Sequence, residues 1–472
     1  MNIFKKCISV FLLSTLITAS SIANVSSSTK VPKKDKDVAK MMNDYMNELN
    51  TQYPFSGTVL VSQKEKIIFR KAYGKADYEN NIPNTPKTKF SIASMTKSFT
   101  AIGIMILQES GELNVKDYIS KYIPDFPNGD KITIENLLTH TSGIPDYFTW
   151  DFCLSEESKK RQTPEEIINL FKNQPLSFEP GKQYQYCNSN YALLGYIIEI
   201  VSGGKYEDFL ADNIFDPLDM KDTGFYLDLK NVKNKSRPYQ RSENILDNSL
   251  QSPIYANPTS TYAAGGMYST IDDLYLWNRA LSDGRLLTQE SLDQMYKRYL
   301  PEIGYGYGFV LDNVHGQKCI SHSGSLPGVD SYILRFIDED TCIIILSNLK
   351  ASKLAKMETN LYSILHEGKY ETPEQFKEVN IDSNLLDNYT GKYEFAPGYD
   401  IEVIKKDNGL SFVTKSYGIS PSEFSTIFPC SEKKFFHKYQ DLNIEFMDIQ
   451  NGKSQKAIVT TFDMPIEFRR ID

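Results

Sequence analysis

A serine and a lysine stand three residues apart at the start of a long apolar segment, which requires a fold able to bury a helix on all sides. Ser94-Met95-Thr96-Lys97 leads into residues 99–107, which are almost entirely apolar, and Gly111 is suited to end the helix. Residues three apart share one helix face, so the Lys97 amine can reach the Ser94 hydroxyl. Free backbone N–H groups at the helix start can stabilise a developing negative charge.

The Ser-x-x-Lys spacing is a weak signal by itself. It also occurs at residues 27–30 and 431–434, in polar stretches that no apolar helix follows. Ser94 could equally be a helix cap. A catalytic interpretation therefore needs further elements elsewhere in the chain.

Two further segments carry suitable polar side chains. Tyr186-Cys187-Asn188 lies between a Pro-Gly turn and an amphipathic helix, and His322-Ser323-Gly324-Ser325 ends a β-like run. Tyr-x-Asn also occurs at residues 45–47, 78–80 and 255–257, of which Tyr255 is the strongest rival. The turn before Tyr186 and the helix after it favour Tyr186.

Together, the three elements resemble the serine β-lactamase and penicillin-binding protein family, in particular class C β-lactamases, D-alanyl-D-alanine carboxypeptidases and related esterases. The resemblance covers roughly residues 38–368, including 137–145 and 263–274. It implies a hydrolase that forms an acyl-enzyme on D-alanyl peptides of peptidoglycan and reacts with β-lactams, without metal or cofactor. The alternatives are a β-lactamase, an esterase, or a non-catalytic penicillin sensor or wall-binding protein.

The resemblance also implies roles for individual residues. Ser94 is the expected nucleophile, and the backbone N–H groups of Ser94 and Ser325 form the expected oxyanion hole, where one donor typically contributes about 3 kcal/mol. Asn188 is expected to orient Lys97 and the substrate amide, unless it only caps its helix. The expected substrate-binding residues are Asn188, His322, Ser323, Gly324 and Ser325.

His322 departs from the commoner β-lactamase pattern, which has lysine at this position. A histidine at this position resembles the pattern of the D-alanyl-D-alanine peptidase and esterase branches of the family. It argues against an efficient β-lactamase. With the Ser323 and Ser325 hydroxyls, His322 could bind a substrate carboxylate. Because a free histidine titrates near pH 6.5, that binding should weaken as the pH rises through this value. His140 is expected to brace a loop.

Either Tyr186 or Lys97 can be the general base. For Tyr186, the pKa must fall from about 10 to about 7, which costs roughly 4 kcal/mol. A charged Lys97 about 4 Å away would offset about 4 kcal/mol at an effective dielectric constant near 20, so Tyr186 is the preferred base. In the alternative, burial keeps Lys97 neutral and Lys97 itself takes the proton.

The first 23 residues predict a secretory signal peptide. Lys5 and Lys6 precede an apolar run at residues 7–17, and Ser21-Ile22-Ala23 suits cleavage before Asn24. The run is short for a spanning helix, so we expect membrane association only if this segment is retained. The protein would then be extracytoplasmic, either secreted or associated with the cell wall or membrane. Its formal net charge of −8 argues against nucleic acid as a partner.

Cysteine usage predicts neither a disulfide framework nor a zinc site. One of the 6 cysteines lies in the signal segment, and the other five show no paired spacing: Cys153, Cys187, Cys319, Cys342 and Cys430. Cys319 and Cys342 fall on strands predicted to be neighbours and could be bridged, although unpaired core thiols are the preferred interpretation. Cys187 is expected to be a small buried residue rather than a reactive thiol.

Hydrophobic periodicity predicts an α+β fold, an antiparallel sheet flanked by helices with an inserted helical region. The predicted strands come from both ends of the domain, with helices at about residues 90–300 between them: 57–63, 67–73, 318–322, 331–336 and 342–347. We expect the active site where the sheet meets the helical region.

After about residue 370 the pattern becomes all-β and predicts a small barrel. Strands are predicted at residues 400–404, 410–415, 443–448, 457–462 and 466–470, with Asn408-Gly409 and Asn451-Gly452 as hairpin turns. The barrel could bind a wall polymer or pack on the hydrolase.

The 472 residues, 40% of them hydrophobic, suffice for more than one core. We therefore expect a signal peptide at 1–23, a polar linker at 24–37, a serine β-lactamase-like hydrolase domain at 38–370, a linker at 371–385 and a β-barrel accessory domain at 386–472.

Overall fold

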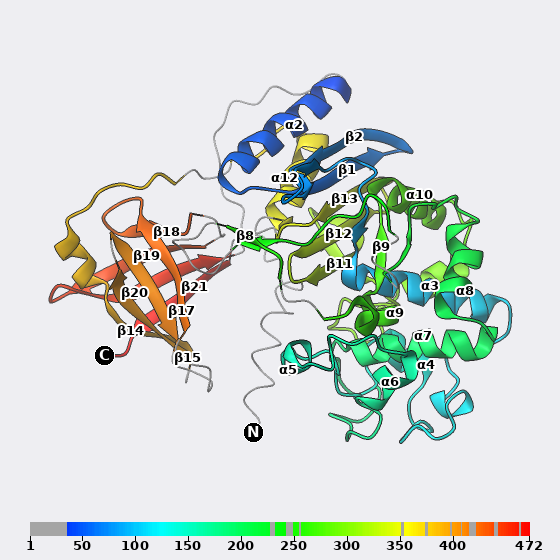
Figure 1. Cartoon of the computed structure of the whole chain (residues 1–472). Coiled ribbons are helices and arrows are strands. Elements are labelled where there is room, and N and C mark those ends of the chain that lie inside the picture. The colour runs from blue at the N-terminus through cyan, green and yellow to red at the C-terminus, as the bar shows by residue number, and fades with distance from the viewer. Residues whose placement is uncertain are drawn as a thin grey trace. The chain divides into compact units, whose positions relative to one another are not determined.

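The computed structural model describes residues 35–226, 232–241, 249–253, 256–350, 354–372, 376–396, 399–406, 408–414, 422–438, 442–461 and 464–472. The described residues form two compact units (Figure 1). The larger unit contains Thr58–Ser236 and Ile254–Leu346, and the smaller contains the described parts of Val31–Gly57, Arg237–Pro253 and Ser347–Asp472. The expected signal peptide lies outside the described residues.

A six-stranded sheet is the framework of the larger unit. Its order is β10 (Val310–Val314), β11 (Gln317–Leu326), β12 (Val329–Phe336), β13 (Thr341–Ser347), β1 (Gly57–Gln63) and β2 (Lys66–Tyr73). The sheet thus combines strands from both ends of the domain, as predicted. In β11 and β12, His322 pairs with Ile333 and Gly324 with Ser331.

Helices fill the chain between β2 and β10. They are α3 (Thr96–Glu109), α4 (Ile134–Leu138), α5 (Trp150–Leu154), α6 (Pro164–Asn169), α7 (Asn188–Ser202), α8 (Tyr206–Leu210), α9 (Tyr262–Gly265), α10 (Ile271–Ser282) and α11 (Gln289–Met295). Figure 1 shows α3, α7 and α9 close together, and these three helices pack on one another. Every residue of α3 from Thr96 to Met105 is buried, which confirms the prediction of a helix enclosed on all sides.

Short elements complete this part of the chain. The strands are β3 (Lys75–Asp77), β4 (Ile82–Pro83), β5 (Phe90–Ser91), β6 (Gly224–Phe225), β7 (Gln240–Arg241), β8 (Leu250–Gln251) and β9 (Met267–Ser269). Single helical turns occur at η1 (Ala93–Met95), η2 (Ile119–Lys121), η3 (Ala211–Phe215) and η4 (Pro258–Thr261).

The smaller unit contains two longer helices and a barrel. Helix α2 (Asp35–Gln52) begins before the predicted residue 38 and packs against α12 (Leu354–Glu367). The Tyr45 hydroxyl on α2 donates a hydrogen bond to the Lys356 carbonyl oxygen on α12 at 3.2 Å.

Eight strands close into the barrel. They are β14 (Gly391–Ala396), β15 (Tyr399–Lys406), β16 (Gly409–Thr414), β17 (Ser422–Pro429), β18 (Lys434–Phe436), β19 (Leu442–Gln450), β20 (Lys453–Thr461) and β21 (Met464–Arg470), preceded by the turn η5 (Ser383–Asn388). Both predicted hairpins are confirmed, because β15 pairs with β16 and β19 with β20 across the two Asn-Gly turns.

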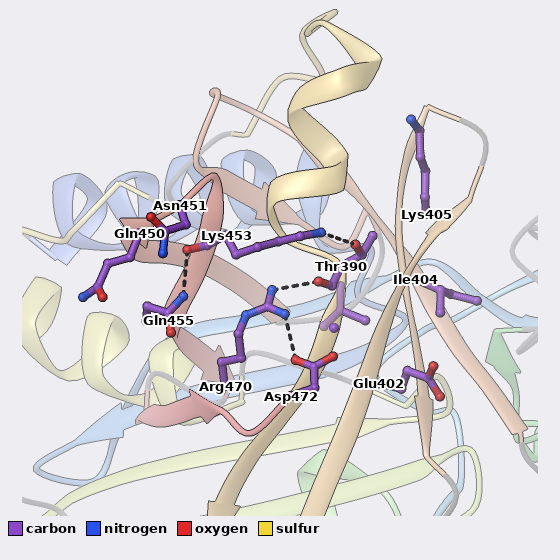
Figure 2. Close-up of a pocket in the computed structure, with 12 residues that line it drawn as sticks. Thr390, Glu402, Ile404, Lys405, Gln450, Asn451, Lys453, Gln455, Arg470 and Asp472 are labelled. Atoms are coloured by element: carbon purple, nitrogen blue, oxygen red, sulfur yellow. Dashed lines mark hydrogen bonds and ion pairs between the residues drawn. The ribbon is translucent and has the colours of Figure 1, made fainter.

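A groove of about 660 Å³ on the barrel is lined by residues of β14, β15, β19, β20, β21 and the adjoining turns (Figure 2). The Arg470 side chain at this groove is 7% exposed. It donates hydrogen bonds to the Thr390 carbonyl oxygen (2.7 Å) and the Ser454 carbonyl oxygen (2.6 Å), and it pairs with Asp472 (2.7 Å). Arg470 therefore ties β21 to the start of β14, where the barrel closes.

The possible bridge between Cys319 and Cys342 is wrong. Neither cysteine forms a disulfide, and strand β12 lies between their strands β11 and β13. Two strands separated by a third lie roughly 10 Å apart, beyond the reach of a disulfide. Both thiols are buried in the core, as the preferred interpretation held.

In the part of the chain that the structure describes, no helix is long and apolar enough to cross a membrane.

Candidate active site

Ser94 and Lys97 lie together at the start of α3. Ser94 is on the turn η1, directly after Ala93, whose φ of 45° is unusual for a non-glycine residue and marks a constrained backbone. The Lys97 side chain is fully buried. Its Nζ lies 3.2 Å from Ser94 Oγ, 2.8 Å from Asn188 Oδ1 and 2.8 Å from the Ala264 carbonyl oxygen. The two residues that the sequence paired are thus in hydrogen-bond contact.

Tyr186 and Asn188 join this pair from the N-terminus of α7. Lys97 Nζ lies 4.8 Å from the centre of the Tyr186 ring, and the Ser94 side chain is near the Tyr186 hydroxyl. The rival Tyr255 lies outside the described residues, as do residues 27–30. Ser431 is in a turn of the barrel, where its Oγ accepts the Lys434 N–H at 2.9 Å. The structure therefore brings together the Ser94, Lys97 and Tyr186 side chains.

Strand β11 approaches the nucleophile through a glycine. A Cβ atom on Gly324 would lie 2.2 Å from the Ile92 carbonyl oxygen and 2.9 Å from the Ser94 backbone nitrogen, too close for any other residue without movement. Ser331 on β12 secures the same place by donating to the Ile92 carbonyl oxygen at 2.7 Å. Ser325 follows Gly324 and is exposed, and Ser323 is half-buried. The strand thus brings its predicted substrate-binding residues to the side of Ser94.

Burial shifts the pKa values of the two candidate bases in opposite directions. It lowers the pKa of Lys97 to about 7, although Asp146 nearby raises it. It raises the pKa of Tyr186 well above 10, and the nearby Ser94 side chain offsets only part of this shift. The prediction that the pKa of Tyr186 falls to about 7 is therefore wrong, and the electrostatics favour Lys97 as the base.

His322 is neutral in this site. It is 3% exposed, and burial together with the charge of Lys97 lowers its pKa to about 3. Its Nδ1 donates to the Ser323 carbonyl oxygen at 2.6 Å, so Nε2 accepts from the Tyr305 hydroxyl at 3.2 Å. Both ring nitrogens already have partners. The expected titration of a positive His322 near pH 6.5 is therefore wrong.

His140 braces the segment that carries Tyr186, as predicted. Its Nδ1 accepts the Cys187 N–H at 3.2 Å, and its ring centre lies 4.4 Å from that of Tyr186. The φ of His140 is 58°, which a close turn imposes on this fully buried residue. Cys187 is buried and its pKa is raised to about 12, which fits the predicted inert thiol.

Asp146 belongs to this site and was not predicted from the sequence. Its carboxylate accepts the Asn188 side-chain N–H at 3.0 Å and the Asn188 backbone N–H at 3.1 Å. The residue directly follows the segment 137–145, which the resemblance had already singled out. Helix α7 offered a second signal, because Cys187 at its N-cap supplies no capping hydrogen bond and an acceptor must come from elsewhere.

These groups can support nucleophilic catalysis. They place a hydroxyl, a buried amine and a phenol within contact of one another, beside a strand edge and the N-terminus of a helix. Within the described ranges, no group of three or more His, Cys, Asp or Glu residues is placed to hold a metal ion.

Comparison with known proteins gives one family across most of this chain. The family described as "Beta-lactamase" matches residues 42–365. "Penicillin-binding protein 4*" of Bacillus subtilis (strain 168) is 30% identical over 428 residues, which are 86% of this chain and 93% of that protein.

Solved structures show the same fold. A penicillin-binding protein from Bacillus halodurans is 28% identical with a TM-score of 0.60, over 69% of this chain and 98% of that one. A D-amino acid amidase from Ochrobactrum anthropi SV3, complexed with D-phenylalanine, is 25% identical with a TM-score of 0.61, over 71% and 99%.

Proposed function

Because this chain belongs to the β-lactamase family of serine hydrolases, we propose that it forms an acyl-enzyme at Ser94 and acts on D-alanyl peptides of peptidoglycan. The observation that carries the proposal is the buried Lys97 amine held 3.2 Å from Ser94 Oγ. The similarity to penicillin-binding proteins supports the peptide as substrate and β-lactams as reactants.

Lys97 is the general base of the proposed reaction. Asn188 Oδ1 and the Ala264 carbonyl oxygen can only accept hydrogen bonds, so a neutral Lys97 amine donates its two N–H groups to them. Its lone pair then faces Ser94 Oγ. A pKa of about 7 leaves a large fraction of this amine neutral at physiological pH, which suits a base.

The acylation step follows from these positions. Ser94 Oγ attacks the carbonyl carbon and gives its proton to Lys97, while the backbone N–H groups of Ser94 and Ser325 stabilise the oxyanion. The bond between the carbonyl carbon and the leaving nitrogen then breaks. Lys97 returns its proton through the Tyr186 hydroxyl, which stays protonated, to the leaving nitrogen, which departs as an amine. Water then hydrolyses the ester on Ser94 and regenerates the enzyme.

The environment of His322 favours a second candidate substrate, a D-amino acid amide or ester. A neutral His322 whose two ring nitrogens are hydrogen-bonded supplies no charge to bind a substrate carboxylate. Of the predicted carboxylate-binding groups, only the Ser323 and Ser325 hydroxyls then remain. The similarity to a D-amino acid amidase supports this alternative.

One experiment separates these substrates. Purified wild-type protein and Ser94→Ala are incubated with benzylpenicillin, a D-alanyl-D-alanine peptide and D-alanine amide, and covalent mass, released D-alanine and released ammonia are followed. A penicillin adduct with D-alanine released from the peptide supports the peptidase, and ammonia from the amide alone supports the amidase. Rapid loss of the adduct would instead indicate a β-lactamase. Labelling that persists in Ser94→Ala would contradict the assignment of the nucleophile.

We further propose that the protein is exported and acts at the cell wall. The charged and apolar segments at residues 1–23 support this location. N-terminal sequencing of the protein recovered outside the cytoplasm should give Asn24 as the first residue, and an intact Met1 would contradict cleavage.

A further inference from the structure

The base mechanism depends on the orientation of one amide. If the Asn188 side chain were rotated by half a turn, its N–H group rather than its oxygen would face Lys97. That N–H would donate to the lone pair of the neutral amine and compete with Ser94 for it. The catalytic site therefore needs a partner that fixes the amide in one orientation.

We propose that Asp146 is a positioning residue that locks the Asn188 amide with its oxygen toward Lys97. This inference rests on the proposed function of Lys97 as the base. Asp146 lies on the loop after α4, and Asn188 opens α7. The Asp146 carboxylate accepts the Asn188 Nδ2–H group at 3.0 Å, so the other end of the amide, Oδ1, lies 2.8 Å from Lys97 Nζ.

Capping of α7 does not account for both carboxylate oxygens. Asp146 Oδ1 accepts the backbone N–H groups of Asn188 and Phe148, both at 3.1 Å, which satisfies the helix start. Asp146 Oδ2 accepts from the Asn188 side chain instead. An ionised carboxylate can only accept, so the amide cannot turn over without placing its oxygen against another acceptor.

The same carboxylate acts on Lys97 through its charge. Several titratable groups face the Lys97 amine from the surrounding elements, namely Asp146, Tyr186, Cys187, Tyr191, His140 and His322. Burial suppresses ionisation of the tyrosines, the thiol and the imidazoles. Asp146 is the carboxyl group of this set. Burial raises its pKa above the ordinary value, and the Phe148 N–H, the charge of Lys97 and the Asn188 N–H groups oppose that shift. Its negative charge raises the pKa of Lys97.

The test is the pH dependence of acylation in Asp146→Asn, measured with p-nitrophenyl acetate as a neutral probe. Removal of the charge favours the neutral amine, so the acid limb of the rate profile should move to lower pH by about one unit. Loss of the amide lock should lower the plateau rate per active site by roughly tenfold to a hundredfold, with a smaller change in KM. Titration with benzylpenicillin counts the active sites.

Asp273→Asn is the matched control. Asp273 also accepts one backbone N–H, from Asp222 at 2.8 Å, and one side-chain donor, Thr223 Oγ1 at 2.7 Å. Loss of the Asp273 carboxylate should affect stability in a similar way but leave the acid limb of the acylation rate profile at the wild-type pH. If Asp146→Asn does not fold, Asp146→Ser also removes the charge and should show the same shift.

The outcomes are distinguishable. An acid limb that stays at the wild-type pH, or moves to higher pH, overturns the positioning role whatever the plateau rate. A wild type that neither probe acylates overturns the proposed function and this inference together. If the wild type is acylated but the acid limb of Asp146→Asn stays at the wild-type pH, this inference alone is overturned.

Discussion

His322 shows how strongly burial controls the single residues of this site. A buried imidazole loses the hydration that its protonated form needs, and here the pKa falls to about 3. In the unfolded chain the same residue titrates near pH 6.5. Between these two values the unfolded state binds the extra proton, so stability must fall as the pH falls through this window.

We therefore predict that replacement of His322 by Asn reduces the acid sensitivity of folding. The free energy of unfolding of the wild type should fall with decreasing pH, and His322 should contribute about 1.4 kcal/mol per pH unit between about pH 6 and pH 4. Urea unfolding at several pH values measures this slope. The control His315→Asn makes the same substitution at an exposed residue in the turn before β11. Equal slopes in wild type and His322→Asn would contradict the buried neutral state.

The contact of Ser94 with Lys97 was predictable because helix geometry is local, and residues three apart in sequence lie on the same helix face. The protonation of Lys97, Tyr186 and His322 was not, because it depends on how completely α7, α9 and β11 exclude water. Asp146 escaped notice for a related reason. Its partner Asn188 is 42 residues away in sequence, and no local pattern links them.

At the scale of elements, the site depends on how closely β11 approaches η1. Gly324 permits this approach, since an added Cβ would lie 2.2 Å from the Ile92 carbonyl oxygen and 2.9 Å from the Ser94 nitrogen. Both atoms belong to the backbone and cannot rotate away. A methyl group here must push β11 away from the nucleophile.

We predict that Gly324→Ala lowers the rate of acylation by benzylpenicillin by at least a hundredfold, because a displacement of about 1 Å misplaces the oxyanion donors. It should also lower the melting temperature. Stopped-flow acylation and calorimetry measure the two effects. Gly204→Ala is the control, since an added Cβ there meets only Ser202 Oγ at 3.9 Å, and it should change neither quantity. A fully active Gly324→Ala would mean that β11 does not form part of the site.

Strands with a clear pattern were predictable, and strands without one were not. The Asn-Gly turns located two barrel hairpins because few residues accept the left-handed conformation, with φ of 50° at Asn451 and 74° at Gly452. Strands β10, β14, β17 and β18 of the sheet and the barrel were missed, as were the short strands β3 to β9. Strand β18 has only 3 residues, and β10 carries Asp312 and Asn313 in its centre.

At the scale of the whole molecule, two hydrophobic clusters of the described residues share no member. One core joins α3, α7, α10 and the sheet, and includes Trp277. The other lies inside the barrel and is rich in aromatic residues, among them Tyr389, Tyr393 and Phe446. Both tryptophans, Trp150 and Trp277, belong to the larger unit. Tryptophan fluorescence therefore reports on the larger unit, whereas circular dichroism in the far ultraviolet also reports on the barrel strands.

This separation allows a test in which the barrel is weakened and the hydrolase is not. Arg470→Met removes the buried donor of the Thr390 carbonyl oxygen and one of two donors to the Ser454 carbonyl oxygen, which also accepts from the Tyr393 hydroxyl at 3.3 Å, and should destabilise the barrel by about 1–3 kcal/mol. In urea, part of the circular dichroism change should move to lower concentration, while the tryptophan transition and the acylation rate of Ser94 stay at their wild-type values. Arg469→Met is the matched control, because the neighbouring Arg469 side chain is 79% exposed and pairs with Glu467 at the surface. A shift of both transitions together would show that the two cores unfold as one cooperative unit, and a slower acylation would show that the barrel supports the active site.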